Sequence, residues 1–219
     1  MQWSQRARIS LFIPLYFIVL LWVIEILDWA TEGALEHLGI MPRQLSGLAG
    51  IFLAPLLHDD FSHLFSNTVP LFLLGWALIY FYRSLAYRVV LITWLLDGLG
   101  VWLIGRPSYH LGASGLVYGM TAFVFFSGLL RRNRQLMALS LAVVFVYGGM
   151  VWGMFPYLTH VSWEGHLFGF LTGVFLAVFY RNQGPSDDPV PEWMQEQDGH
   201  DDQAASEPQP ETGRTDKPI

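Results

Sequence analysis

The sequence contains no cysteine, which excludes disulfide bonds, thiolate metal sites and cysteine nucleophiles. Charged residues are also scarce, since they make up 14% of the 219 residues, whereas 53% are hydrophobic. Soluble domains carry about 25% charged residues on average. This composition is typical of a protein that lies largely within a membrane.

The formal net charge of −6 combines two regions of opposite sign. Residues 1–181 carry ten Arg against eight acidic residues, whereas residues 182–219 carry two basic residues against ten acidic ones. We therefore expect a membrane domain over 1–181, followed by a disordered, acidic cytoplasmic tail over 182–219. With an acidic tail and no basic stripe, we expect no nucleic-acid partner.

Six apolar segments are expected to cross a lipid bilayer. They comprise residues 9–28, 62–82, 85–104, 114–130, 136–155 and 163–180. The long loop 29–61 contains a shorter apolar run, from Leu48 to Leu57, which we expect to insert only partly. The predicted fold class is therefore an all-α membrane protein, a bundle of six transmembrane helices with a disordered C-terminal tail.

Arginine positions predict the orientation of this bundle. Eight of the ten arginines in 1–181 precede the first segment, follow the last, or lie in turns on the same side, whereas the opposite loops hold only Arg43 and Arg106. The positive-inside rule then places both termini in the cytoplasm. The second, fourth and sixth segments begin outside, which brings His63, Ser114 and His166 to one depth. Ionisable side chains that gather within a membrane indicate a functional site.

Ser114 begins the fourth segment in the run Gly112-Ala113-Ser114-Gly115. The flanking glycines permit a sharp turn and the close approach of a substrate backbone, and they leave an amide free to face an oxyanion. Position 116 is leucine, so the G-x-S-x-G elbow of soluble hydrolases is not matched. A serine at this position can also serve as a helix cap, because its oxygen can satisfy a free backbone N–H group.

His166, near the start of the sixth segment, could act as the base. Small residues on the fourth and sixth segments predict that these helices pack backbone to backbone. They are Gly115, Gly119, Ala122, Gly165, Gly169 and Gly173. Such packing would bring the Ser114 hydroxyl and a His166 nitrogen to roughly 3 Å, with Tyr118 placed to support the imidazole. The alternatives are that His166 is an interfacial residue and Tyr118 an ordinary packing aromatic.

His63 and Asn67 lie one helical turn apart on the second segment. Both side chains can donate a hydrogen bond, which is what the developing oxyanion of acyl transfer requires. We assign them, together with the Ser114 amide, to oxyanion stabilisation. The alternative is that either residue only ties the loop 29–61 to the bundle.

Two further histidines, His58 and His110, raise the question of a metal site. The sequence has no H-E-x-x-H motif and no carboxylate at ligand spacing on the same face, so we expect neither a metal nor another cofactor. Asp97 is the remaining acid within a predicted span. It could stand behind the histidine as a third catalytic member, but a hydrogen bond within the bundle is the simpler interpretation.

Taken in order, three motifs resemble those of the rhomboid intramembrane serine proteases. They are His63-Leu64-Phe65-Ser66-Asn67, then Gly112-Ala113-Ser114-Gly115 with Tyr118, and finally Gly165-His166-Leu167-Phe168-Gly169. The resemblance covers about residues 9–180. It implies six helices around a water-accessible cavity, Ser114 as nucleophile and His166 as general base in a dyad without an acid member. It also implies oxyanion donors at His63, Asn67 and Ser114, supporting roles for Gly112, Gly115, Tyr118 and Gly169, and a cap formed by the loop near 156–162.

The implied activity is an intramembrane serine endopeptidase that cuts transmembrane proteins near the extracytoplasmic interface. Its partners would be transmembrane protein substrates and the lipid bilayer, in what the composition indicates is a prokaryotic cell (inner) membrane; the oligomeric state is left open. The alternative is a non-enzymatic rhomboid-like chaperone or a transporter that binds transmembrane helices. One departure concerns the first external loop, where many rhomboids have a Trp-Arg pair: no Trp in 29–61 is followed by Arg, so the anchoring of this loop is in question.

Overall fold

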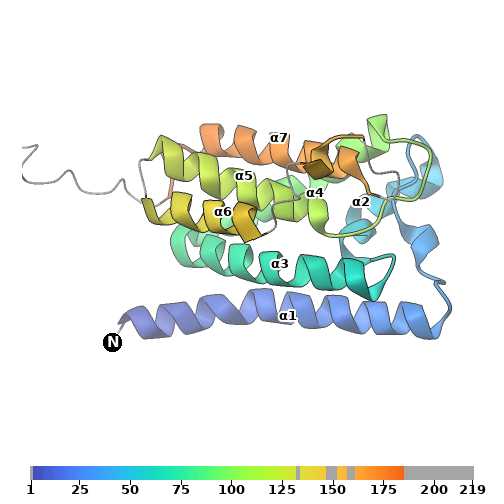
Figure 1. Ribbon diagram of the computed structural model, residues 1–219, viewed down its shortest axis with the longest axis horizontal. Coiled ribbons are helices and arrows are strands. Elements are labelled where there is room, and N and C mark those ends of the chain that lie inside the picture. Colours follow the sequence, from blue (N-terminus) through green and yellow to red (C-terminus); the bar gives the residue numbers. More distant parts are fainter. Residues whose placement is uncertain (1, 132–133, 147–151, 157–160, 185–219) are drawn as a thin grey trace, which may run out of the picture. The chain divides into compact units, whose positions relative to one another are not determined.

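The computed structural model describes residues 2–131, 134–146, 152–156 and 161–184. Within these ranges the chain is helical, with no strand (Figure 1). The helices are α1 (Gln2–Ala30), α2 (Gly50–Leu53), α3 (Phe61–Tyr82), α4 (Ser84–Ile104), α5 (Ser114–Leu130), α6 (Arg134–Val146) and α7 (Trp163–Phe179). Four short 3-10 helices are η1 (Glu36–Leu38), η2 (Leu45–Leu48), η3 (Ala54–Leu56) and η4 (Trp152–Met154). Apart from its first three residues, the expected acidic tail lies outside the described residues.

Among the described residues, three helices are long and apolar enough to cross a bilayer by length and composition. They are Ser10–Ala30 within α1, Phe61–Tyr82 and Leu85–Ile104. Helices α5 and α7 are also apolar but contain 17 residues each. The expected run Leu48 to Leu57 does not form a span, because it is divided among η2, α2 and η3.

The fifth expected span differs most from the structure. An apolar helix was expected over 136–155, but the described part of α6 ends at Val146, and residues Trp152–Met154 form the separate 3-10 turn η4. Hydropathy alone cannot distinguish an apolar helix from an apolar turn that packs against a protein site. This turn contributes to the candidate active site described below.

The outer faces of the helices carry large hydrophobic side chains. On α1, Tyr16 is 68% exposed, and on α7, Phe175 and Phe179 are 56% and 65% exposed. Soluble monomers rarely expose contiguous apolar surfaces of this kind. Together with the three helices long enough to cross a bilayer, these exposed apolar faces point to an integral membrane protein.

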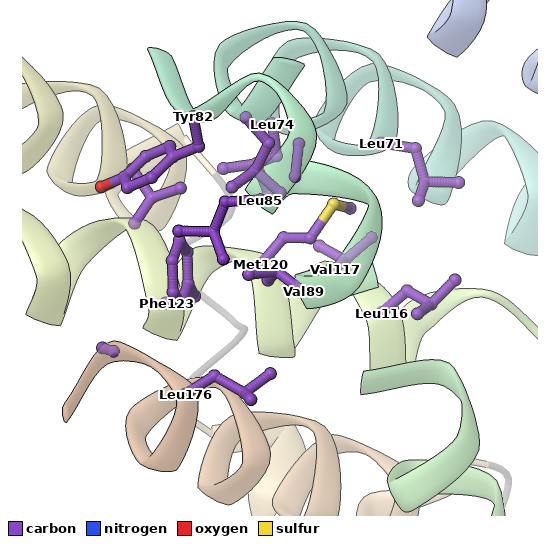
Figure 2. Packing of buried hydrophobic residues seen from close by; sticks show 14 of the residues in the cluster. Leu71, Leu74, Tyr82, Leu85, Val89, Leu116, Val117, Met120, Phe123 and Leu176 are labelled. Carbon is purple, nitrogen blue, oxygen red and sulfur yellow. The ribbon is translucent and has the colours of Figure 1, made fainter. Parts of the chain in front are cut away.

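The buried core joins α1, α3, α4, α5, α6 and α7. Figure 2 shows part of this core, in which Leu74, Val89, Phe123 and Leu176 come from four different helices. The Tyr82 and Phe123 rings pack edge to face, with centroids 5.0 Å apart. The core therefore fixes α5 between α3 and α7, the two helices whose N-terminal ends carry the candidate histidines.

The segment between α1 and α3 is held by hydrogen bonds to α4 and to the loop before α5. The Arg43 guanidinium donates to the Gly105 carbonyl at 2.8 Å, and the Trp102 and Trp94 indoles donate to Gln44 and Ile51 carbonyls at 2.9 and 3.1 Å. Ile40 and His110 form an isolated antiparallel β-bridge. These contacts anchor the loop although its sequence has no Trp-Arg pair.

Candidate active site

Ser114 is the first residue of α5, and its hydroxyl does not cap the helix. The N-cap position belongs to Ala113, whose side chain cannot accept a hydrogen bond. The Ser114 Oγ atom instead lies 2.8 Å from His166 Nε2 on α7. The helix start therefore directs the hydroxyl at the imidazole, and the cap interpretation is wrong.

The partners of the His166 ring determine its tautomer. His166 is buried, and its Nδ1 atom lies 2.8 Å from the carbonyl oxygen of Gly153 in η4. A carbonyl oxygen can only accept a hydrogen bond, so Nδ1 carries the proton in the neutral ring. Nε2 is then free to accept the Ser114 hydroxyl proton, which is the arrangement that a general base requires.

Tyr118 lies one turn along α5 and forms a platform for the imidazole. The two rings are stacked, with centroids 4.1 Å apart and an interplanar angle of 11°. Gly153 closes the space beside them: a Cβ atom there would overlap the Tyr118 hydroxyl and would lie 3.0 Å from His166 Nδ1. The imidazole is therefore held on its face by Tyr118 and at Nδ1 by a backbone carbonyl.

Small residues bring α5 and α7 together, and these two are the most extensively packed pair among the described helices. A Cβ atom at Gly169 would lie 2.9 Å from the Gly115 carbonyl carbon and closer still to its oxygen. A Cβ atom at Gly173 would likewise overlap the Gly119 carbonyl oxygen. Gly165 differs from the expectation because its nearest neighbours include Asp97 and Val101 on α4 rather than residues of α5.

His63 lies beside the turn that leads into Ser114. Its imidazole packs against Gly112, where a Cβ atom would lie 2.6 Å from His63 Cε1. Gly112 also has a φ of +108°, a conformation that L side chains rarely adopt, so both space and backbone geometry favour glycine. On its other side, His63 Nδ1 lies 3.8 Å from Asp59 Oδ2.

Asn67 lies one turn further along α3 and is buried. Its Nδ2 atom has no hydrogen-bond partner within the described part of the chain. A buried amide donor that is left unpaired costs about 1–3 kcal/mol. Such a donor is available to a ligand that carries negative charge.

Two contacts outside the expected set hold the turn before Ser114. The Gly112 amide donates to the Ala54 carbonyl of η3 at 2.9 Å, and the Ala113 amide donates to His58 Nε2 at 3.5 Å. Burial lowers the pKa of His58 to about 3, with His63 adding to the effect. His58 is therefore neutral near pH 7, which leaves its Nε2 able to accept.

Both ring nitrogens of His110 contact residues outside the contact between Ser114 and His166. Its Nδ1 lies 2.7 Å from Ser162 Oγ and its Nε2 lies 3.1 Å from the Arg106 carbonyl oxygen. Ser162 in turn accepts from the Gly165 amide at the start of α7. No group of three His, Asp or Glu side chains in the described ranges could hold a metal ion. His110 thus links the loop before α5 to the start of α7.

Asp97 does not stand behind the catalytic candidates. His166 Nδ1 already donates to Gly153, whereas the Asp97 carboxylate lies against Gly115, where a Cβ atom would overlap Oδ2. The Oδ1 atom of Asp97 is buried, and it has no partner within the described residues. The interpretation of Asp97 as a third catalytic member therefore has no support in this geometry.

The expected capping loop near 156–162 falls mostly on residues 157–160, which lie outside the described residues. The candidate site otherwise draws on α3, α5, α7 and η4. The sequence indicated all of these elements except η4. A backbone carbonyl carries no side-chain signal, so nothing in the sequence identifies Gly153 as the partner of His166.

Comparison with known proteins gives matches over most of the chain. A family model described as the Rhomboid domain matches residues 45–183. Uncharacterized proteins of Mycobacterium tuberculosis and Mycobacterium bovis are each 41% identical to the chain over 172 residues, which cover 74% of this chain and 72% of the relative. An uncharacterized protein of Mycobacterium leprae is 37% identical over 173 residues, covering 74% of this chain and 68% of the relative. The residues from His63 to His166 lie inside the matched range.

Proposed function

Because the chain belongs to the rhomboid family, we propose that it is an intramembrane serine endopeptidase that cleaves transmembrane segments near the extracytoplasmic interface. The observation that carries the proposal is the 2.8 Å contact between Ser114 Oγ and His166 Nε2. The hydroxyl has no cap function at its helix start, and the imidazole has the tautomer that can accept its proton. Both features suit a nucleophile with its base.

The proposed topology has six transmembrane helices with both termini in the cytoplasm. The arginine distribution supports this orientation. Helices α5 and α7 contain 17 residues each, which corresponds to roughly 26 Å of helix, slightly less than the ~30 Å hydrocarbon core. Helices of this length would start below the outer membrane surface, so Ser114 and His166 would lie at a depth where a substrate helix begins to leave the bilayer.

The proposed reaction begins when Ser114 Oγ attacks the scissile carbonyl carbon while His166 Nε2 takes the hydroxyl proton. The imidazolium that forms is stabilised by its hydrogen bond from Nδ1 to the Gly153 carbonyl. His166 then returns the proton to the leaving amine, which produces an acyl-enzyme. Water hydrolyses the ester with His166 again acting as base.

Three donors are proposed to stabilise the oxyanion. The Ser114 amide belongs to the first turn of α5, where backbone N–H groups have no partner within the helix and the helix dipole is positive. The unpaired Asn67 Nδ2 and the His63 imidazole, which packs on Gly112, supply the other two. Four further residues are proposed to support the site. Gly112 allows the turn before Ser114 to pack on His63, Gly115 and Gly169 allow α5 and α7 to approach closely, and Tyr118 stacks on the His166 ring.

Replacing Asn67 by alanine should lower the rate of cleavage by roughly 10²-fold without abolishing it, because one preorganised oxyanion donor of three is lost. The rate should be measured on a reconstituted transmembrane substrate. Thermal unfolding should change little, since Asn67 Nδ2 has no partner to lose within the described residues. An unchanged cleavage rate would remove Asn67 from the proposed oxyanion site.

Substrates are proposed to be single-pass proteins with Gly or Pro near the cleaved bond. A peptide bond inside a transmembrane helix is shielded because its carbonyl is hydrogen-bonded and water is absent. Replacing these helix-weakening residues by Leu should therefore slow cleavage by about tenfold or more, since Gly and Pro cost about 1 and 3 kcal/mol in a helix. Equal cleavage of both substrates would contradict this requirement.

The class of function can be tested with a fluorophosphonate probe on the purified protein in detergent. Such a probe forms a covalent bond with an activated serine, so it should label the protein and the label should map to Ser114. A protein that only binds transmembrane helices, as a chaperone or transporter does, would retain helix binding but take no label. Absence of label from folded protein would therefore favour the non-enzymatic alternative.

A further inference from the structure

A cavity of about 240 Å³ lies between the C-terminal end of α1 and the N-terminal end of α3. Its walls come from the last turns of α1, the turn before η1 and the residues that lead into α3. It is separate from the contact between Ser114 and His166. In the proposed topology it opens at the extracytoplasmic interface.

Acidic side chains dominate this cavity. Six of the eight acidic residues in 1–181 line it, and none of the lining residues is basic. They are Glu25, Asp28, Glu32, Glu36, Asp59 and Asp60. Two of these carboxylates also have structural roles, because Asp28 accepts from the Leu35 amide at 2.6 Å and Asp60 accepts from the His63 amide at 2.8 Å.

Among the six carboxylates, Glu25 is buried although no structural role within the described residues explains its burial. The residue is only 5% exposed, and its Oε2 atom has no hydrogen-bond partner in the ranges the structure describes. A buried carboxylate oxygen without a partner is costly, so a cation in the cavity would stabilise it.

Two aromatic rings complete the wall. Trp29 and Phe61 both line the cavity, and their centroids lie 6.4 Å apart. Trp29 is 71% exposed. Carboxylates combined with aromatic faces are the surroundings that bind guanidinium and ammonium groups, through charge-assisted hydrogen bonds and cation–π contacts.

We propose that this cavity binds an arginine or lysine side chain on the extracytoplasmic flank of the substrate. An inorganic ion fits less well, since no three ligating side chains in the described ranges are grouped for a metal and the cavity volume is several times the ~30 Å³ of one water molecule. Basic residues are uncommon on extracytoplasmic flanks, so the cavity would select a minority of transmembrane proteins. This inference rests on the proposed protease function for its biological role.

The cavity is connected to the proposed oxyanion site through His63. Asp59 lines the cavity and its Oδ2 lies 3.8 Å from His63 Nδ1, while the other side of the same imidazole packs on Gly112, two residues before Ser114. A substrate side chain bound among these carboxylates would therefore lie on the α1 side of the proposed scissile position. The His63 side chain would therefore lie between the site that binds the substrate's charge and the proposed catalytic site.

Binding should be measured with the Ser114→Ala protein in nanodiscs, because this variant should bind the peptide without cleaving it. The probe is a synthetic single-span peptide with a fluorophore at its cytoplasmic end and one Arg on its extracytoplasmic flank. A matched peptide carries Gln at that position. We expect the Arg peptide to bind about fivefold more tightly, which is the upper end of what a partly exposed charged contact provides. High salt should reduce the difference.

Glu25→Gln and Glu32→Gln, each combined with Ser114→Ala, should bring binding of the Arg peptide close to that of the Gln peptide. Glu32 is exposed, so its replacement tests the cavity even if the buried Glu25→Gln change impairs folding. Gln44→Ala in the same loop, outside the cavity lining, is the matched control and should leave the preference intact.

The outcomes separate this inference from the protease assignment. Equal binding of the two peptides overturns the cavity proposal, and so does stabilisation of the protein by millimolar Ca²⁺ that Glu25→Gln removes. Cleavage of both peptides by the unmodified protein would in that case leave the protease assignment standing. If Ser114→Ala binds the Arg peptide selectively but the unmodified protein cleaves neither peptide, the cavity proposal is supported and the protease assignment is refuted.

Discussion

Replacing Ser114 or His166 by alanine is expected to abolish turnover, with the cleavage rate falling by roughly 10⁴-fold or more. In the proposed mechanism, the two side chains form one proton-transfer unit through the 2.8 Å contact between Oγ and Nε2. Removing both should therefore cost little more than removing either one. The rate should be measured as fragment release from a fluorescent transmembrane substrate in proteoliposomes.

Matched controls are available for both changes. Ser46→Ala and His37→Ala replace exposed residues of η2 and η1, and each should keep the original rate. All variants should unfold at similar temperatures, so that a loss of rate reports on chemistry. Full activity in Ser114→Ala or His166→Ala would refute the proposed dyad.

Gly169→Ala is expected to have the second largest effect. The new Cβ atom would lie 2.9 Å from the Gly115 carbonyl carbon and would overlap the carbonyl oxygen, so α7 must move away from α5. Overpacking of this kind costs about 1–3 kcal/mol of stability. It would also separate Ser114 from His166, and a displacement near 1 Å can cost about 10²-fold in rate. We expect both a lower unfolding temperature and a loss of at least about 10²-fold in cleavage.

Gly165→Ala provides the comparison for this change. It lies on the same helix, but its Cβ atom would meet Ser162 Oγ at 3.3 Å and the nearest atoms of Asp97 and Val101 at 3.6 Å. Its effect on rate and stability should therefore be far smaller. Equal effects of the two substitutions would show that close packing against α5 is not what Gly169 provides.

The sequence predicted the positions of most helices because hydropathy and length specify membrane helices directly. The fourth expected segment, 114–130, coincides with α5, and the sixth ends one residue beyond α7. The fifth segment was predicted too long, since apolar residues of η4 continue the hydrophobic run after α6. An apolar run predicts that its residues lie in apolar surroundings, but it does not predict whether their backbone is helical.

The approach of Ser114 to His166 could be predicted because small residues on two segments indicated close packing. The contribution of each glycine could not be predicted, because the rotation of a helix about its axis decides which residues face the neighbouring helix. Gly165, which faces α4 rather than α5, is the example. The roles of Ala54 and His58 in holding the turn before Ser114 also required the structure. Both act across more than 50 residues of sequence, and no local pattern records such a contact.

The Gly153 carbonyl has a consequence for how the proposed activity can be inhibited. No substitution deletes a main-chain oxygen, so a scan that truncates side chains one by one would pass over the acceptor that sets the His166 tautomer. The oxygen can only be moved, by bulk introduced at Gly153 or by displacement of the η4 turn. In the proposed mechanism, an inhibitor that displaces this turn would remove the acceptor of the His166 Nδ1 hydrogen bond and so impair the base, while Ser114 and His166 stay chemically intact.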